Sequence, residues 1–170
     1  MKYVVCAIKI IDKISETVGK FASTFIIITL ALQIGEVVMR YFIGRSTVWT
    51  WEVSTHLYGA NFMLAAAWAL KEGKHVRTDI LYSRLSPKVK AILDLCTFST
   101  FFLLFVVFLS FFTIRSAAFS VSIWESSHTM TWVPIWPLRI SIAVGFSLLL
   151  LQGLAKIARD VIFLVKGETV

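Results

Sequence analysis

The sequence predicts an all-α integral membrane protein with four transmembrane helices and both termini in the cytoplasm. Hydrophobic residues make up 58% of its 170 residues and charged residues only 16%, which is too apolar a composition for an ordinary soluble domain. The apolar residues fall into runs of roughly 20 residues, the length that crosses the hydrocarbon core of a bilayer. One long basic stretch, residues 71–90, separates these runs and predicts their orientation.

The basic stretch is expected to be a cytoplasmic loop. It carries Lys71, Lys74, Arg77, Arg84, Lys88 and Lys90. Short loops rich in Lys and Arg stay in the cytoplasm, so the helices before and after this loop are expected to end on that side. Its apolar residues are spaced along one side of a helix and predict a basic amphipathic segment on the inner membrane surface: Val76, Ile80, Leu81 and Leu85.

The N-terminal residues 1–21 are charged throughout, so we do not expect a cleavable signal there. Their apolar residues recur at helical spacing, with the lysines mostly on the other side. Two interpretations remain open. The segment is either a surface helix on the cytoplasmic headgroups before the chain turns into the membrane, or the polar start of a longer first membrane helix.

The first two membrane helices are expected at about 23–42 and 52–70. Glu36 and Arg40 lie in the outer part of the first helix, four residues apart, so they share a face and are expected to pair. Glu52 lies in the first turn of the second helix, where the helix dipole favours an acidic residue.

The connection between these two helices is short and aromatic. Trp49 and Trp51, together with Tyr41, predict an aromatic belt at the outer membrane surface. The second helix contains many small residues, including Gly59, which allow neighbouring backbones to approach closely. We therefore expect this helix in the middle of the bundle.

The third membrane helix is expected at about 88–114, or extended further outward, and the fourth at about 138–160. Phenylalanines at spacings of three and four predict a stripe on the third helix that faces lipid, the core or a partner: Phe98, Phe101, Phe105, Phe108 and Phe112. A small and polar strip on the fourth helix is expected to face protein: Ser141, Gly145, Leu148 or Leu149, and Gln152.

The distribution of positive charge agrees with this topology at every crossing. Of the 17 Lys and Arg residues, 13 fall on the predicted cytoplasmic side. The other four lie at or near the predicted outer side: Arg40, Arg45, Arg115 and Arg139. We attribute the basic residues to topology and to anionic phospholipid, and we expect no nucleic-acid binding.

The sequence shows no motif for catalysis, for phosphate binding or for a metal site, so we expect no enzyme activity and no cofactor. His56, His75 and His128 suggest a haem-binding anchor as one alternative, although only the first and last fall near a common depth. Glu36 suggests another, a small proton-coupled exporter, because carboxylates within a membrane are often functional. Its competing interpretation is a structural pair with Arg40.

Four short motifs resemble one family of transport proteins. They are WTWE at 49–52, GA at 59–60, GKHVRTD at 73–79 and WVPIWP at 132–137. Their order resembles the small permease (Q-type) subunit of TRAP (tripartite ATP-independent periplasmic) transporters. The most specific part is HVxxD with its preceding glycine, formed by Gly73, His75, Val76 and Asp79, and the likeness covers nearly the whole chain.

The resemblance implies a single membrane domain over residues 1–170 in the bacterial inner membrane. It also implies a large permease partner, bound one-to-one, and a periplasmic solute-binding protein. The implied process is sodium-driven uptake of an organic acid, of C4-dicarboxylate or sialic acid type, in which this chain is a non-catalytic scaffold.

The specialised surfaces of the chain are expected to serve these two partners. The residues expected near the large permease are Glu36, Arg40, Glu52, Gly59, Phe101, Phe105 and Phe108. Those expected on the side of the binding protein are Trp124, Glu125, Trp132 and Trp136.

Overall fold

A computed structural model describes residues 2–73, 89, 92, 95–129 and 132–166, and these residues are almost entirely helical. The elements are α1 (Lys2–Val38), the short π-helix η1 (Met39–Ile43), α2 (Val48–Lys71), the π-helix η2 (Phe98–Leu103), α5 (Leu104–Ser122) and α6 (Trp136–Lys166). Most of the predicted amphipathic segment at 71–90 lies outside the described residues.

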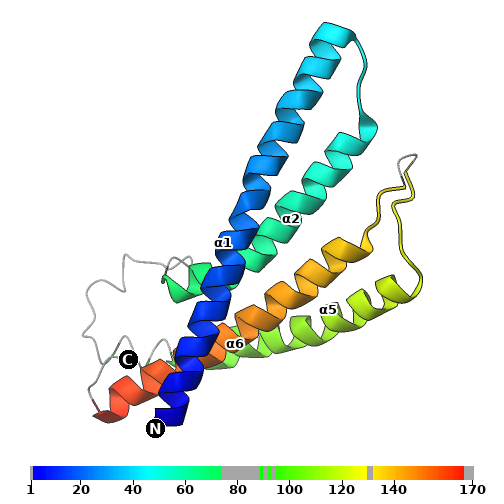
Figure 1. The fold of residues 1–170 in the computed structure, drawn as a ribbon. Coiled ribbons are helices and arrows are strands. Elements are labelled where there is room, and N and C mark those ends of the chain that lie inside the picture. Colours follow the sequence, from blue (N-terminus) through cyan, green and yellow to red (C-terminus); the bar gives the residue numbers. More distant parts are fainter. Residues whose placement is uncertain (1, 74–88, 90–91, 93–94, 130–131, 167–170) are drawn as a thin grey trace.

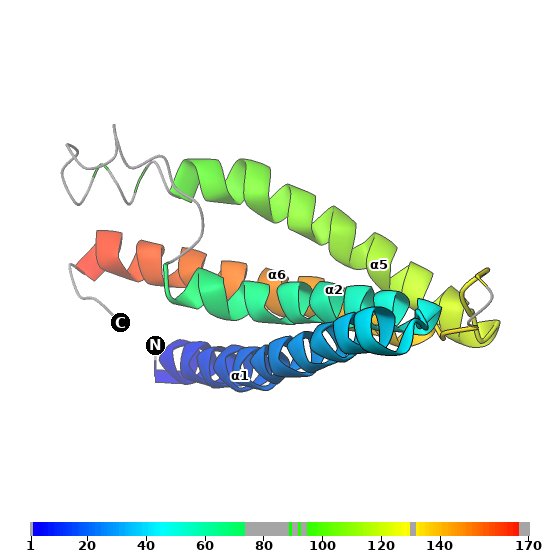
Figure 2. The ribbon, with the colours of Figure 1, turned by 90° about the horizontal axis from the view of Figure 1, so that it is seen from above.

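The helices form two hairpins that diverge from a shared contact region (Figure 1). One hairpin is α1 with α2, and the other is α5 with α6. α2 packs against both α1 and α6, while α5 packs mainly against α6. The prediction that the second helix lies in the middle is therefore confirmed. In the view of Figure 2, both hairpin connections lie at one end of the molecule, and the start of α1 and the end of α6 lie at the other.

α1 is one uninterrupted helix of 37 residues. At 1.5 Å per residue it is about 55 Å long, whereas the hydrocarbon core is only ~30 Å thick. Its N-terminal half is held in the fold by a buried face that contains Ile8, Ser15 and Ala22. The helix therefore begins well before the expected start of the membrane span near residue 23 and runs without a break, which agrees with the interpretation of a longer first helix. The span at 23–42 stays a prediction.

The other helices are also longer than the membrane spans expected from the sequence. α2 begins at Val48 rather than near residue 52, directly after Gly44 turns the chain with a φ of 70°. α5 ends at Ser122, so this helix continues past residue 114. α6 begins at Trp136 because Pro137 is tolerated in a first helical turn, and it continues to Lys166, past the expected end at residue 160.

Among the described residues, three helices are long and apolar enough to cross a membrane: Tyr3–Ile43, Leu95–Ser122 and Trp136–Val165. The all-helical membrane class is therefore confirmed. α2 has 24 residues but is not one of the three, because polar side chains such as His56 and Asn61 make it less apolar. A fourth span at α2 stays a prediction.

The two hairpins meet through small residues. A Cβ atom added at Gly145 of α6 would lie 2.6 Å from the backbone oxygen of Met63 in α2, so only glycine fits there. Leu148, Leu149 and Gln152 of the same helix are buried as well. The prediction that this strip of α6 faces protein is confirmed at these positions.

The phenylalanine stripe divides into two parts. Phe98 packs against the buried core of Leu70, Val106 and Leu149. Phe101, Phe105, Phe108 and Phe112 are exposed on the chain. The prediction that all five share one side is wrong for Phe98, because the wider turn of the π-helix η2 shifts the helical register there.

Candidate functional site

A polar network around Glu36 closes the loop end of the α1–α2 hairpin. Arg40 Nη2 donates to Glu36 Oε1 at 3.0 Å, and the Ser46 hydroxyl donates to the same oxygen at 3.1 Å. The backbone N–H of Thr47 donates to Glu36 Oε2 at 3.0 Å, and the Thr47 hydroxyl also donates to it. Thr47 is the residue that precedes α2, so this carboxylate satisfies a backbone donor at the start of that helix.

The network confirms that Glu36 and Arg40 pair. The two side chains differ in their exposure. The Glu36 side chain is 10% exposed, and the Arg40 side chain is 60% exposed. Both carboxylate oxygens already accept hydrogen bonds from the loop. Glu36 therefore acts as a structural acceptor that holds the connection between α1 and α2.

Glu52 links the start of α2 to the connection between α5 and α6. The Ser127 hydroxyl donates to Glu52 Oε1 at 3.0 Å, and the Thr129 hydroxyl donates to the same oxygen. Ser127 and Thr129 lie more than 70 positions away from Glu52 in the sequence. Glu52 thus joins the loop ends of the two hairpins.

The connection between α5 and α6 is a folded loop, closed by a bidentate ion pair. Arg139 Nη2 lies 2.8 Å from Glu125 Oε1, and Arg139 Nε lies 2.8 Å from Glu125 Oε2. A third nitrogen, Arg139 Nη1, donates to the Ser116 hydroxyl at 2.6 Å. The Ser120 hydroxyl, followed by the Arg139 guanidinium, holds the pKa of the Glu125 carboxyl below its usual value. Glu125 is therefore ionised and fixed to the first turn of α6.

Three tryptophans lie in or beside this loop. Trp124 and Trp132 have positive φ angles of 49° and 52°, a conformation that bulky residues rarely adopt. Their side chains are 74% and 75% exposed. Trp136 contacts Trp124 edge to face, with ring centroids 5.7 Å apart. The structure thus gathers Trp124, Glu125 and Trp136, and it places Trp132 on the opposite arm of the same loop.

At the other end of the molecule, a second polar network joins α1 to α6. The Ser15 hydroxyl donates to Gln152 Oε1 at 3.1 Å, and both side chains are completely buried. Gln152 Nε2 donates to Asp12 Oδ1 at 2.8 Å, and Arg159 pairs with the same carboxylate. Sequence reasoning missed Asp12, Ser15 and Arg159. Two features of the sequence could have indicated this network. Asp12 and Ser15 are three residues apart, so they share a helix face, and Gln152 is a polar residue within an apolar run.

Glu16 fastens α1 to the end of α2. Its carboxylate lies 2.6 Å from Lys71 Nζ and 2.5 Å from Lys20 Nζ. Lys71 was expected only to mark a cytoplasmic loop. The structure shows that it also makes a contact between helices.

The remaining predicted positions are less connected to one another. Gly59 faces Leu138 of α6, whose Cδ1 would lie 3.3 Å from an added Cβ. Gly73 ends α2 with a φ of 66°, and its N–H donates to the Leu70 carbonyl at 3.1 Å. His75, Val76 and Asp79 lie outside the described residues. In the part of the chain that the structure describes, no group of three or more His, Cys, Asp or Glu side chains is placed to hold a metal ion.

The fold and these networks define a small multi-pass helical membrane protein whose polar clusters hold helices and loops together. A family model for the DctQ component of tripartite ATP-independent periplasmic (TRAP) transporters matches residues 25–162. The chain belongs to this family, the small permease components of TRAP transporters, which confirms the resemblance found in its motifs. It is a family of transporter components and not of enzymes. The search of curated proteins gave no match.

Proposed function

We propose that this chain is the non-catalytic scaffold subunit of a TRAP transporter. It binds one large permease subunit and supports sodium-driven, binding-protein-dependent uptake of an organic acid of C4-dicarboxylate or sialic acid type. The observation that carries the proposal is the family match over residues 25–162. Membership of a transporter-component family favours assembly with the other components over independent transport.

The proposed topology has four spans in a single domain over residues 1–170, in the bacterial inner membrane, with both termini in the cytoplasm. α2 supplies the fourth span. Two observations support this arrangement. α2 lies between α1 and α6, which are both long and apolar enough to cross a membrane. The two hairpin connections share one end of the molecule, as an even number of crossings requires (Figure 2).

The proposed contact with the large permease is centred on the exposed phenylalanines of η2 and α5. Phe101 of η2 and Phe105 and Phe108 of α5 are exposed on the chain. Lipid tails are as apolar as these rings, so burial from water does not drive the contact. Close packing of the rigid aromatic side chains supplies the interaction.

The polar residues of the proposed permease interface have a different role. Arg40 is exposed and is available to a partner. Glu36 and Glu52 hold the loops that present this surface, and Gly59 sets the spacing between α2 and α6. We therefore assign these three residues to the shape of the interface.

The loop between α5 and α6 is the proposed docking surface for the periplasmic binding protein. It presents Trp124 and Trp132 on a backbone that the Glu125–Arg139 ion pair holds in place. Exposed aromatic side chains on a rigid support are typical of interface hot spots, since little conformational entropy is lost on binding.

The exporter alternative loses support from the geometry of Glu36. A proton-carrying carboxylate needs a free oxygen on a transport pathway. Both oxygens of Glu36 accept hydrogen bonds from Arg40, Ser46 or Thr47.

Co-purification with the large permease tests the proposed interface. The triple variant Phe101→Ala, Phe105→Ala and Phe108→Ala should lose most of the complex. The matched control, Ile27→Ala, Leu30→Ala and Ile34→Ala, removes three exposed apolar side chains from α1 and should retain it. Equal retention by both variants would exclude the α5 stripe as the contact.

A further inference from the structure

One face of α1 is exposed along the whole helix. It consists of the residues that follow one another from Tyr3 to Val38 at alternating intervals of four and three positions, and we name it the α1 seam. Every residue of the seam is exposed, and none is charged. The buried residues of α1, Ile8, Ser15 and Ala22, lie on another side of the helix. The α1 seam is therefore not covered by the fold of the chain itself.

The first half of the seam lies too far from the bilayer to be covered by lipid. With the span at the expected residues 23–42, Ile14 lies about 14 Å and Ile10 about 20 Å beyond the hydrocarbon core, since α1 continues straight out of it. The headgroup layer on each side is only about 5 to 7 Å thick. Ile14 is nevertheless 45% exposed and Ile10 55% exposed.

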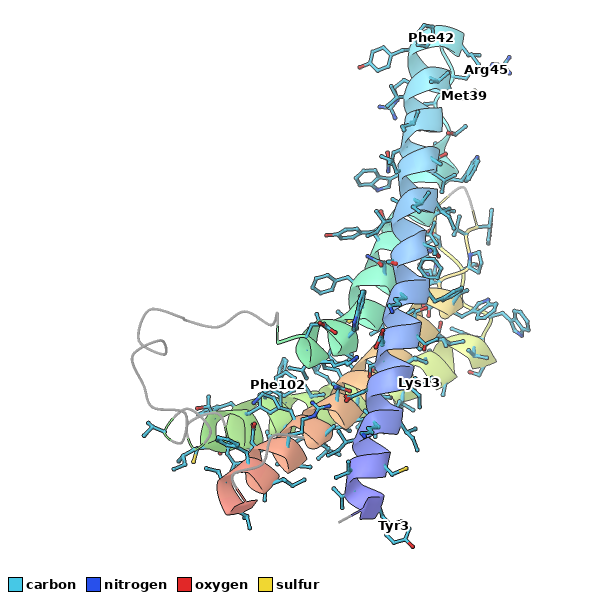
Figure 3. The ribbon with its side chains drawn as sticks, turned by 60° about the vertical axis from the view of Figure 1, so that its left-hand side comes forward. Tyr3, Lys13, Met39, Phe42, Arg45 and Phe102 are labelled. Carbon is cyan, nitrogen blue, oxygen red and sulfur yellow. The ribbon has the colours of Figure 1, made fainter. Side chains whose placement is uncertain are left out.

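The start of the helix shows the same exposure. Tyr3 is 90% exposed, and Figure 3 shows its side chain projecting away from the end of α1. A continuous apolar row in water is typical of a surface that another protein covers. The partner of the seam is therefore protein, at least along this half.

The threonines of the seam do not require water. The Thr17 hydroxyl donates to the Lys13 carbonyl at 2.8 Å, and the Thr24 hydroxyl donates to the Phe21 carbonyl at 2.7 Å. A partner can cover both residues without leaving a hydroxyl donor unpaired.

The spacing of the seam identifies its partner as a helix. A repeat of 3.5 residues is the repeat of two helices that wind around each other. The partner must carry the same repeat, cross the same membrane and continue about 20 Å into the cytoplasm. A second copy of α1 meets all three requirements and runs in the same direction.

The charges beside the seam permit this self-pairing. In a parallel pair, the residues that flank the seam on one side of a helix meet those on the opposite side of its partner. Lys13 and Lys20 flank the seam on one side, and Ile11 and Val18 flank it on the other. The aliphatic part of each lysine therefore packs over apolar side chains of the second copy, and no like charges meet.

We propose that the α1 seam is a self-association site, at which two copies of this chain pair through parallel α1 helices. The pair is symmetric, so each seam residue faces the same residue of the other copy. In Figure 2, α1 and α5 lie on opposite sides of the molecule, with α2 and α6 between them. Each copy thus keeps its α5 face free. The site needs no permease, so its failure would leave the proposed function untouched.

Disulfide cross-linking in membrane vesicles tests the seam. Two differently tagged full chains are expressed together, both with Cys6→Ser and Cys96→Ser and with the same new cysteine. After oxidation with copper phenanthroline, Ile10→Cys, Ile14→Cys and Ile28→Cys should each give a dimer that carries both tags.

The matched controls place an exposed cysteine on the same helix but off the seam. They are Lys9→Cys and Leu30→Cys, and both should remain monomeric. Equal cross-linking of seam and control positions would overturn the proposal. So would the absence of dimers from every seam position, which is the result expected if the permease or residues 74–94 of the same chain cover the seam.

A charge exchange at Ile14 tests the parallel register. Ile14→Glu and Ile14→Lys each place like charges opposite one another in a pair of identical copies. Each variant alone should self-associate at least about tenfold more weakly than the natural chain, measured by sedimentation of the full chain in neutral detergent. The two variants mixed should pair with each other and co-purify through their different tags.

Lys9→Glu is the control for the charge exchange, because Lys9 lies off the seam, and it should self-associate like the natural chain. The proposal is overturned if the mixture of the two Ile14 variants pairs no better than either variant alone. It is also overturned if the natural chain sediments as a monomer at every concentration.

Discussion

Contacts within each hairpin differ in kind from contacts between the two hairpins. Within a hairpin, charged side chains close a loop over a short stretch of sequence, as Glu36 does with Thr47 and Glu125 with Arg139. Between the hairpins, Gly145 fits against a backbone oxygen, the buried Ser15 and Gln152 side chains hydrogen-bond, and Asp12 pairs with Arg159. Closure of the loops relies on charge, whereas docking of the hairpins adds close packing and buried polar pairing.

The largest expected effect is at the closest approach of the hairpins. In Gly145→Ala, the new methyl group would meet the Met63 backbone oxygen at 2.6 Å, so the two helices must separate. We expect a loss of about 2 to 3 kcal/mol in the free energy of unfolding, measured in detergent. Gly35→Ala is the control, because its added methyl group meets nothing within 4 Å, and it should be neutral or slightly stabilising.

A smaller effect is expected from opening a loop within a hairpin. Glu36→Gln replaces a carboxylate that accepts from Thr47 and Arg40 with an amide that carries two donors. We expect a loss of about 2 kcal/mol and weaker assembly, with the ion dependence of any remaining transport unchanged. A variant that assembles normally but loses proton coupling would restore the exporter hypothesis.

A third variant removes the buried polar link between the hairpins. Gln152→Leu keeps the side-chain volume but leaves the Ser15 hydroxyl and the Asp12 carboxylate without this partner. We expect a loss of about 1 kcal/mol, because interhelical hydrogen bonds in membrane proteins are individually modest. A loss as large as that of Gly145→Ala would show that polar pairing and not shape dominates the contact between hairpins.

The smallest effect is a dependence on pH at the loop between α5 and α6. The folded state lowers the pKa of Glu125 below its ordinary value of 4.5. Its stabilising contribution is therefore complete above pH 4.5 and is lost as the pH falls through the lowered pKa. Acid should change the fluorescence of Trp124 and Trp136 in the natural chain, and Glu125→Gln should remove this step. A step that persists in the variant would assign it to another group.

This comparison also explains what could be predicted from sequence. Glu36 and Arg40 lie four residues apart, so helical geometry alone predicts their pairing. Gln152 and Ser15 are 137 residues apart, and no local pattern brings them together. The membrane class follows from composition, and the family from short motifs.

Two features of the helices could not be predicted from the sequence, for physical reasons. The charged residues before residue 23 predict a polar segment, but no local pattern shows that Asp12 and Glu16 pair with Arg159 and Lys71 on other helices. Ordinary helical spacing predicts that Phe98 shares one side with the other phenylalanines, whereas the π-helical turn of η2 lets it pack against the core. Tertiary pairing and a π-helical turn leave no local signal in a single sequence.

The central claim is that this chain supports transport by another subunit and carries out none alone. Uptake of a labelled C4-dicarboxylate or sialic acid into proteoliposomes under an inward sodium gradient tests it most directly. We predict uptake only when the chain, the large permease and the binding protein are all present. Uptake or proton flux with the purified chain alone, or full uptake without the chain, would contradict the account.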